Sequence, residues 1–164
     1  MKQDPVERAI TQWAVQKPHL DTEPMAIIGR MLRLSKHLET RIAKLHKQHD
    51  LKMGEFDVLA SLLRSGEPYA LTPNALLSAL MLTSGAMTNR LDRLADKELV
   101  SRASNPLDRR SVSVQLTDKG LELIEQLIEQ HVILQQELMA GIAVNEREPL
   151  NQQLKQWLMT FDTQ

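Results

Sequence analysis

Cysteine is absent from this chain of 164 residues. Its absence excludes disulfides, cysteine-ligated zinc and thiol-based redox sensing. Aromatic residues make up only 3% of the chain, so the core has to rest on Leu, Ile, Val and Met. Long apolar runs are also missing: the stretch from Ala75 to Leu82 includes Ser78 and spans eight residues. A membrane-spanning helix needs about 18, so we expect no membrane segment.

An excess of charge of one sign is lacking as well. Lys and Arg number 20 and Asp and Glu number 21, which gives a formal net charge of −1. Binding to a polyanion would therefore depend on a local basic patch. The N-terminus has no apolar run of the kind found in signal peptides, so we expect a cytoplasmic protein. The 42% content of hydrophobic residues is typical of one globular domain.

Apolar residues recur every three or four positions through most of the chain, which predicts amphipathic helices. Thr residues at positions 72 and 117, and a capping box at Asn145 and Glu148, are typical helix starts. Helices are expected over residues 6–16, 25–48, 53–65, 73–80, 84–97, 118–139 and 145–162.

The hydrophobic period changes to two after residue 110. Val112, Val114 and Leu116 alternate with polar residues, which predicts a strand, and residues 99–102 are its expected antiparallel partner. A loop is expected over residues 103–110. Two short helices joined by a tight turn and followed by such a hairpin form a winged helix-turn-helix. The expected fold is therefore mainly α, with a two-stranded β wing.

Sequence patterns of catalytic and metal sites are missing. The chain has no Gly-rich phosphate loop, no paired-His protease motif and no nucleophile elbow, so we do not expect an enzyme. His46 and His49 are three residues apart, and His37 lies on the same expected helix. No carboxylate completes a set of three or four ligands, and the basic end of a helix accounts for these residues. We expect neither a metal nor a cofactor.

A local basic patch does exist. Residues 83–110 carry six basic side chains against four acidic ones, and the basic ones lie on the second helix of the motif and at the hairpin tip. These elements enter the grooves of DNA in winged helices. The alternatives are that Thr83 or Ser84 only caps the helix and that the hairpin arginines only form a solvated turn. The candidate DNA-binding residues are Thr83, Ser84, Thr88, Asn89, Arg93, Arg109 and Arg110.

The order of elements predicts the division of the chain. Residues 1–24 form an added N-terminal helix with a linker, and residues 25–164 form the winged-helix domain. Its DNA-binding core is expected at about 53–116, and its long dimerisation helices at 25–49 and 117–162. The first and last helices carry wide apolar faces that so small a core cannot absorb, so we expect them to bury against a second copy.

Three segments of the chain resemble the MarR family. They are Leu91-Asp92-Arg93-Leu94-Ala95-Asp96-Lys97-Glu98-Leu99-Val100, Asp108-Arg109-Arg110-Ser111 and Leu116-Thr117-Asp118-Lys119-Gly120. Members of this family are dimeric winged-helix transcriptional regulators. The resemblance implies a homodimer on a palindromic site in double-stranded DNA, released by a small and often aromatic acid.

Further segments are similar to the urate-responsive, PecS-type branch of that family: Lys17-Pro18-His19-Leu20-Asp21, Pro24-Met25 and Gly29-Arg30, together with a Trp on the added helix. The resemblance implies that Trp13, Asp57, Arg64 and Arg90 hold an anionic purine or aromatic ligand. Asp57 and Arg64 are seven residues apart on one expected helix, so they share a face. An ordinary Asp–Arg surface pair, with Trp13 anchoring the dimer, is the alternative.

Two functions from different classes follow from the sequence. The first is a ligand-released, DNA-binding transcriptional regulator that acts as a repressor. The second is a helical dimeric module that binds a ligand or a protein and no longer binds DNA, which the near-neutral net charge allows because DNA affinity depends largely on phosphate neutralisation.

Overall fold

The computed structural model describes residues 3–80, 83–105 and 108–162, without the side chains of residues 103–105, 108–111 and 162. The chain forms two compact units, residues 1–56 and residues 57–164. In the described part of the chain, no helix is both long enough and apolar enough to cross a membrane.

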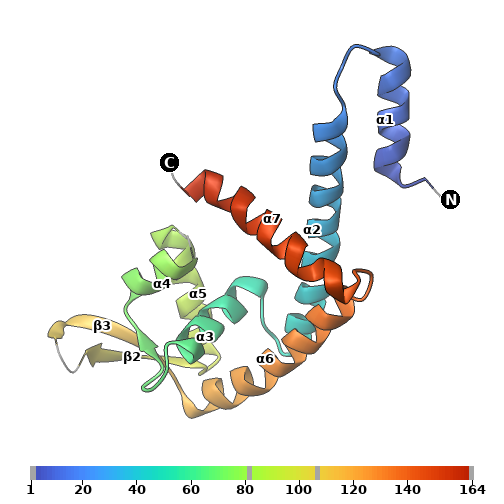
Figure 1. The fold of residues 1–164 in the computed structure, drawn as a ribbon. Helices are drawn as coiled ribbons and strands as arrows, with labels where there is room; N and C mark the ends of the chain where they lie inside the picture. Colours follow the sequence, from blue (N-terminus) through green and yellow to red (C-terminus); the bar gives the residue numbers. More distant parts are fainter. Residues whose placement is uncertain (1–2, 81–82, 106–107, 163–164) are drawn as a thin grey trace. The chain divides into compact units, whose positions relative to one another are not determined.

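The N-terminal unit is a helical hairpin. Helix α1 (Pro5–Gln16) lies beside α2 (Glu23–Gln48), and the unit ends with the first turn of α3 (Met53–Arg64) (Figure 1). Helices α1 and α2 begin within two residues of their expected starts, which confirms the prediction from apolar periodicity. Near the end of α2, the His46 ring stacks on Phe56 with the ring centroids 4.1 Å apart. This stacking gives His46 a packing role near the end of α2.

The C-terminal unit contains a winged helix-turn-helix, as expected. Its elements in chain order are the rest of α3, β1 (Ala70–Leu71), α4 (Pro73–Leu80), α5 (Ser84–Asp96), β2 (Val100–Asn105), β3 (Asp108–Leu116), α6 (Asp118–Leu138) and α7 (Val144–Asp162). Leu side chains from α3, α4, α5 and α6 form the buried core, together with Met87 and Val114. Aliphatic residues and Met therefore carry the packing, as the low aromatic content required.

The sheet differs from the expected two-stranded wing in two ways. It has three antiparallel strands in the order β1-β3-β2, and the added strand β1 pairs Ala70 with Gln115. The loop expected over residues 103–110 is wrong for residues 103–105 and 108–110, because pairing continues through Ser104↔Val112 and Asn105↔Asp108, with a register shift between these pairs. Residues 106–107 of that expected loop lie outside the described residues. The two strands therefore stay paired across an irregularity, beyond the residues that alternate in polarity.

Most of the expected helix starts are correct. Thr72 Oγ1 accepts a hydrogen bond from the Ala75 amide at 3.2 Å, and Thr117 Oγ1 accepts one from the Gly120 amide at 3.0 Å. The last helix also begins within one residue of its expected start, but Asn145 is not its cap, because α7 begins at Val144 and Asn145 already lies in its first turn. The capping-box spacing fits any Asn three residues before a Glu, and here Asn145 lies two residues after the N-cap position.

Close packing joins the end of α5 to the start of α6. Thr117 Oγ1 donates to the carbonyl oxygen of Glu98 at 2.7 Å, and Lys119 Nζ donates to that of Lys97 at 2.8 Å. A Cβ added at Gly120 would lie 2.0 Å from the carbonyl oxygen of Leu99, so only glycine fits here. We call this joint between residues 97–99 and 117–120 the α5–α6 latch.

Candidate functional site

Helix α5 is the second helix of the helix-turn-helix motif and presents a polar face. Met87, Leu91 and Leu94 are buried and attach the helix to the core, whereas Asn89 and Arg93 are exposed one turn apart. Residues four apart lie on the same helix face, so this pair can reach a DNA groove together.

The small hydroxyl residues at the start of α5 have other surroundings. Thr83 occupies the N-cap position, but its side chain makes no capping hydrogen bond. Thr88 Oγ1 donates to the carbonyl oxygen of Ser84 at 3.1 Å. Ser84 and Thr88 also line a mostly apolar cavity of about 390 Å³ between α4, α5 and the wing. The interpretation that Thr83 only caps the helix therefore applies to its backbone and not to its side chain.

An ion pair connects α5 with the wing. Arg102 Nη2 on β2 lies 2.7 Å from Asp92 Oδ1 on α5, and both side chains are about half exposed. The pair adds little to stability because it is exposed to water. The pair links β2 to α5 at this point. Arg109 and Arg110 belong to strand β3, and their side chains are outside the described part of the structure.

A second polar cluster lies inside the C-terminal unit, around a half-buried carboxylate. Burial raises the pKa of Asp57 above its ordinary value of 3.8, while the positive charges of Arg90, His131 and Arg64 act in the opposite direction. Burial likewise lowers the pKa of His131, and Asp57 opposes that shift. The cluster joins three elements, because Asp57 and Arg64 lie on α3, Arg90 on α5 and His131 on α6.

This cluster combines two arginines, which can bind an anion, with one carboxylate acceptor. Arg64 is exposed, and its Nη2 donates to Ser61 Oγ at 3.1 Å, whereas Asp57, Arg90 and His131 are half buried. Partly buried arginines bind planar anions strongly, and a carboxylate accepts from ring N–H groups. Since burial is the largest influence on Asp57, a ligand that donates hydrogen bonds would stabilise its charged form.

His131 was missed from the sequence. It lies 74 positions after Asp57, and nothing in its local pattern separates it from other polar residues on α6. Only the packing of α6 in the C-terminal unit brings it near α3. Trp13, the remaining predicted ligand residue, lies on α1 in the N-terminal unit with 40% of its surface exposed. Its part in the site remains a prediction.

The raised pKa of Asp57 leads to a pH-dependent expectation. A carboxyl whose pKa is higher in the folded than in the unfolded state loses stability as pH rises from the ordinary value of 3.8 through the raised one. We expect Asp57→Asn to be at least as stable as the parent at pH 7, with the difference shrinking toward pH 3.8. Urea unfolding of both proteins across this pH range measures the difference in their free energies of unfolding. An Asp57→Asn variant less stable than the parent at pH 7 would contradict burial as the main influence on the Asp57 pKa.

The surroundings of His46 and His131 can be described. His46 stacks on Phe56, and His131 lies near the carboxylate of Asp57. Within residues 3–80, 83–105 and 108–162, no three His, Asp or Glu side chains are grouped so that they could hold a metal ion. The arginines of the Asp57 cluster are groups that suit an organic anion.

Comparison with known proteins gives consistent matches. A sequence model of the MarR family matches residues 49–111. The HTH-type transcriptional regulator PecS of Dickeya dadantii is 37% identical over 145 residues, which cover 88% of this chain and 87% of PecS. The multiple antibiotic resistance protein MarR of Escherichia coli is 33% identical over 135 residues, which cover 80% of this chain and 90% of MarR.

A solved structure gives the same result. A mutant MarR from E. coli complexed with operator DNA superposes with a TM-score of 0.69 at 30% identity, covering 84% of this chain and 97% of that one. The helix-turn-helix, its exposed polar helix and the wing define a winged-helix transcriptional regulator that binds DNA, not an enzyme. The chain belongs to the MarR family.

Proposed function

We propose that this protein is a repressor that binds a palindromic operator as a homodimer and is released from it by a small anionic aromatic ligand. Urate is the ligand to test first, because Trp13, Asp57, Arg64 and Arg90 match the residues that the PecS-type resemblance assigns to it. We expect this regulator to be cytoplasmic, because it has to reach the DNA that it binds. Residues 1–24 would serve the ligand, and residues 25–164 the DNA and the dimer.

The observation that carries this proposal is the electrostatic link between Asp57 and Arg90. Arg90 belongs to α5, whose exposed face carries Asn89 and Arg93, so one helix serves both the polar cluster and the candidate DNA surface. A ligand that engages Arg90 and Asp57 would favour one position of α5 over another. Coupling between two sites requires such a shared element.

A titration of operator DNA tests the proposal. The fragment upstream of the protein's own gene is titrated with the protein, with and without saturating urate. We expect binding in the absence of urate and a loss of affinity of about tenfold or more in its presence, which corresponds to ~1.4 kcal/mol of differential binding. Unchanged affinity with saturating urate would remove urate as the ligand. Absence of DNA binding would favour the alternative, a dimeric module without DNA.

Exposed apolar faces support the homodimer. On α2, Ile27, Met31 and Leu34 are each at least 38% exposed, and on α7 so are Leu154, Trp157 and Phe161. Monomeric proteins rarely expose contiguous apolar patches of this kind. We expect light scattering at micromolar concentration to give twice the chain mass of 18.7 kDa. Asp substitutions at Trp157 and Phe161 should lower this mass, and a monomeric parent would contradict the proposal.

A further inference from the structure

Helix α1 is held to α2 mainly at its N-terminal end. Of its twelve residues only Val6 is buried. Val6 packs against Gly29 of α2, where an added Cβ would lie 3.4 Å from one Val6 methyl carbon and 3.6 Å from the other. An isolated helix of this length is marginally stable in water. The formation of α1 therefore depends on its contact with α2.

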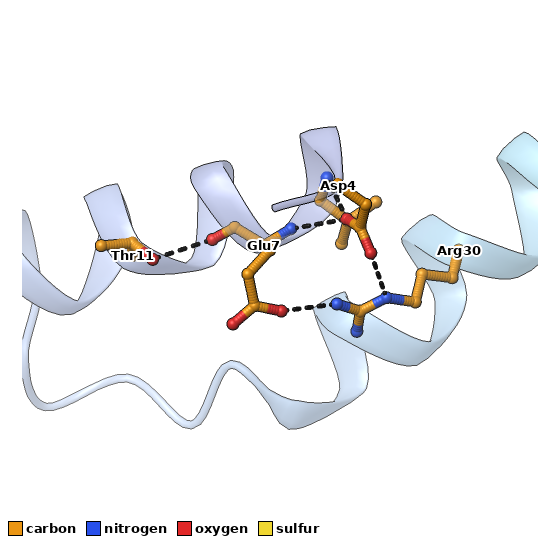
Figure 2. Close-up of polar contacts among 5 residues, drawn as sticks. Asp4, Glu7, Thr11 and Arg30 are labelled. Carbon is orange, nitrogen blue, oxygen red and sulfur yellow. Dashed lines mark hydrogen bonds and ion pairs between the residues drawn. The ribbon is translucent and has the colours of Figure 1, made fainter. Parts of the chain in front are cut away.

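One carboxylate both caps this helix and docks it. Asp4 Oδ1 accepts hydrogen bonds from the amides of Val6 at 2.7 Å and Glu7 at 2.8 Å, which makes Asp4 the N-cap (Figure 2). Its other oxygen, Oδ2, accepts from Nε of Arg30 on α2 at 2.9 Å. Arg30 Nη2 also donates to Glu7 Oε2 at 2.6 Å. The guanidinium thus binds the N-cap carboxylate and the acidic residue of the first turn, and we call this the Arg30 clamp.

The surroundings agree with a charged, formed clamp. The backbone amide of Glu7 and the Arg30 side chain lower the pKa of Asp4, and the two carboxylates raise the pKa of Arg30. The side chains of Asp4, Glu7 and Arg30 are each about half exposed, so the clamp adds little to global stability. Its geometry, a fork on two carboxylates one turn apart, fixes rotation and register instead.

Rotation of α1 decides where Trp13 points. Val6 and Trp13 are seven residues apart, which puts them on one face of the helix and about 10.5 Å apart along its axis. The contact of Val6 with Gly29 and the Arg30 clamp therefore set the direction of Trp13 from the other end of α1. Arg30 is too far along the helix to act on Trp13 except through this rotation.

We propose that Arg30 is a positioning residue for ligand capture: it couples the folding of α1 to its docking on α2 and so presents Trp13. This inference rests on the proposed function. A ligand that needs docked α1 binds with an apparent dissociation constant divided by the docked fraction. Loss of the clamp therefore weakens the apparent ligand affinity without changing the effect of saturating ligand.

The test compares Arg30→Ala with Lys36→Ala, which also removes one exposed positive charge from α2. Urate is titrated against the protein–DNA complex. If the docked fraction falls to about a quarter, the half-maximal urate concentration rises about fourfold while the final release stays that of the parent. Asp4→Asn keeps an N-cap acceptor, so it should also raise the half-maximal urate concentration, but by less than Arg30→Ala does. Lys36→Ala should match the parent.

Hydrogen exchange of the amides in α1 provides a readout that does not involve urate. Arg30→Ala should speed their exchange severalfold, and Lys36→Ala should not. Unchanged exchange in Arg30→Ala would overturn the clamp, and faster exchange with an unchanged half-maximal urate concentration would overturn its link to the ligand. If urate does not change DNA binding by the parent, the proposed ligand is refuted. The exchange experiment then still tests whether Arg30 holds α1 on α2.

Discussion

Asp57→Ala is expected to abolish the response to urate while leaving affinity for DNA near that of the parent. The carboxylate is half buried beside Arg90, and its removal deletes the acceptor for the ligand's N–H groups without touching the exposed face of α5. One charge-assisted hydrogen bond made in a single state is worth roughly 1.5–3 kcal/mol, enough for the whole switch. The measurement is a DNA titration with and without saturating urate.

Two further variants separate the roles within this site. Trp13→Ala should lose the urate response and keep DNA binding, because the added helix is not part of the helix-turn-helix motif. Arg90→Ala should impair both, because Arg90 belongs to α5. Glu122→Ala, an exposed acidic position on α6, is the control for loss of one negative charge. If Asp57→Ala still responds to urate as the parent does, the cluster is not the ligand site.

The double variant Arg109→Ala/Arg110→Ala should bind all DNA sequences more weakly, by up to about 100-fold. We expect roughly tenfold for each arginine, because a hydrogen bond to a charged group is worth about 1.5–3 kcal/mol. The slope of the logarithm of affinity against that of salt concentration should fall by about one unit for each lost phosphate contact. Titrations of specific and unrelated DNA at several salt concentrations measure both effects.

A control for the wing comes from the same strand pair. Arg102→Ala also removes one positive charge from the wing, but Arg102 is engaged by Asp92 at 2.7 Å. Its loss should change the orientation of the wing and lower the affinity with a smaller change in salt slope. Parent-like affinity and slope in the double variant would show that the two arginines make no contact with DNA.

The sequence was informative where periodicity and caps act locally. Helix α2 and the alternation at Val112, Val114 and Leu116 predicted their elements, because each follows one continuous apolar face. Strand β1 has only two residues, too few to show a period, and it forms because β3 offers it a partner. The hairpin extends further than predicted because its strands stay paired across a register shift, beyond the alternating residues.

The residues of the candidate site, too, could be predicted from the sequence only in part. The spacing of Asp57 and Arg64 was enough to place them on one helix face, and the family resemblance added Arg90. The nearness of His131 to Asp57 depends on how α6 packs, which no local pattern encodes. The Arg30 clamp joins residues 23 and 26 positions apart, and charged residues on exposed helix faces give no signal of such pairing.

The α5–α6 latch has a mechanical consequence. Gly120 leaves no room for sliding against Leu99, and Thr117 and Lys119 tie the same turn by hydrogen bonds to backbone carbonyls. The start of α6 and the end of α5 are therefore held against each other at this joint. We therefore expect a change in the direction of α6 to be passed on to α5, the helix proposed to contact DNA, so that the two helices move in a coupled way.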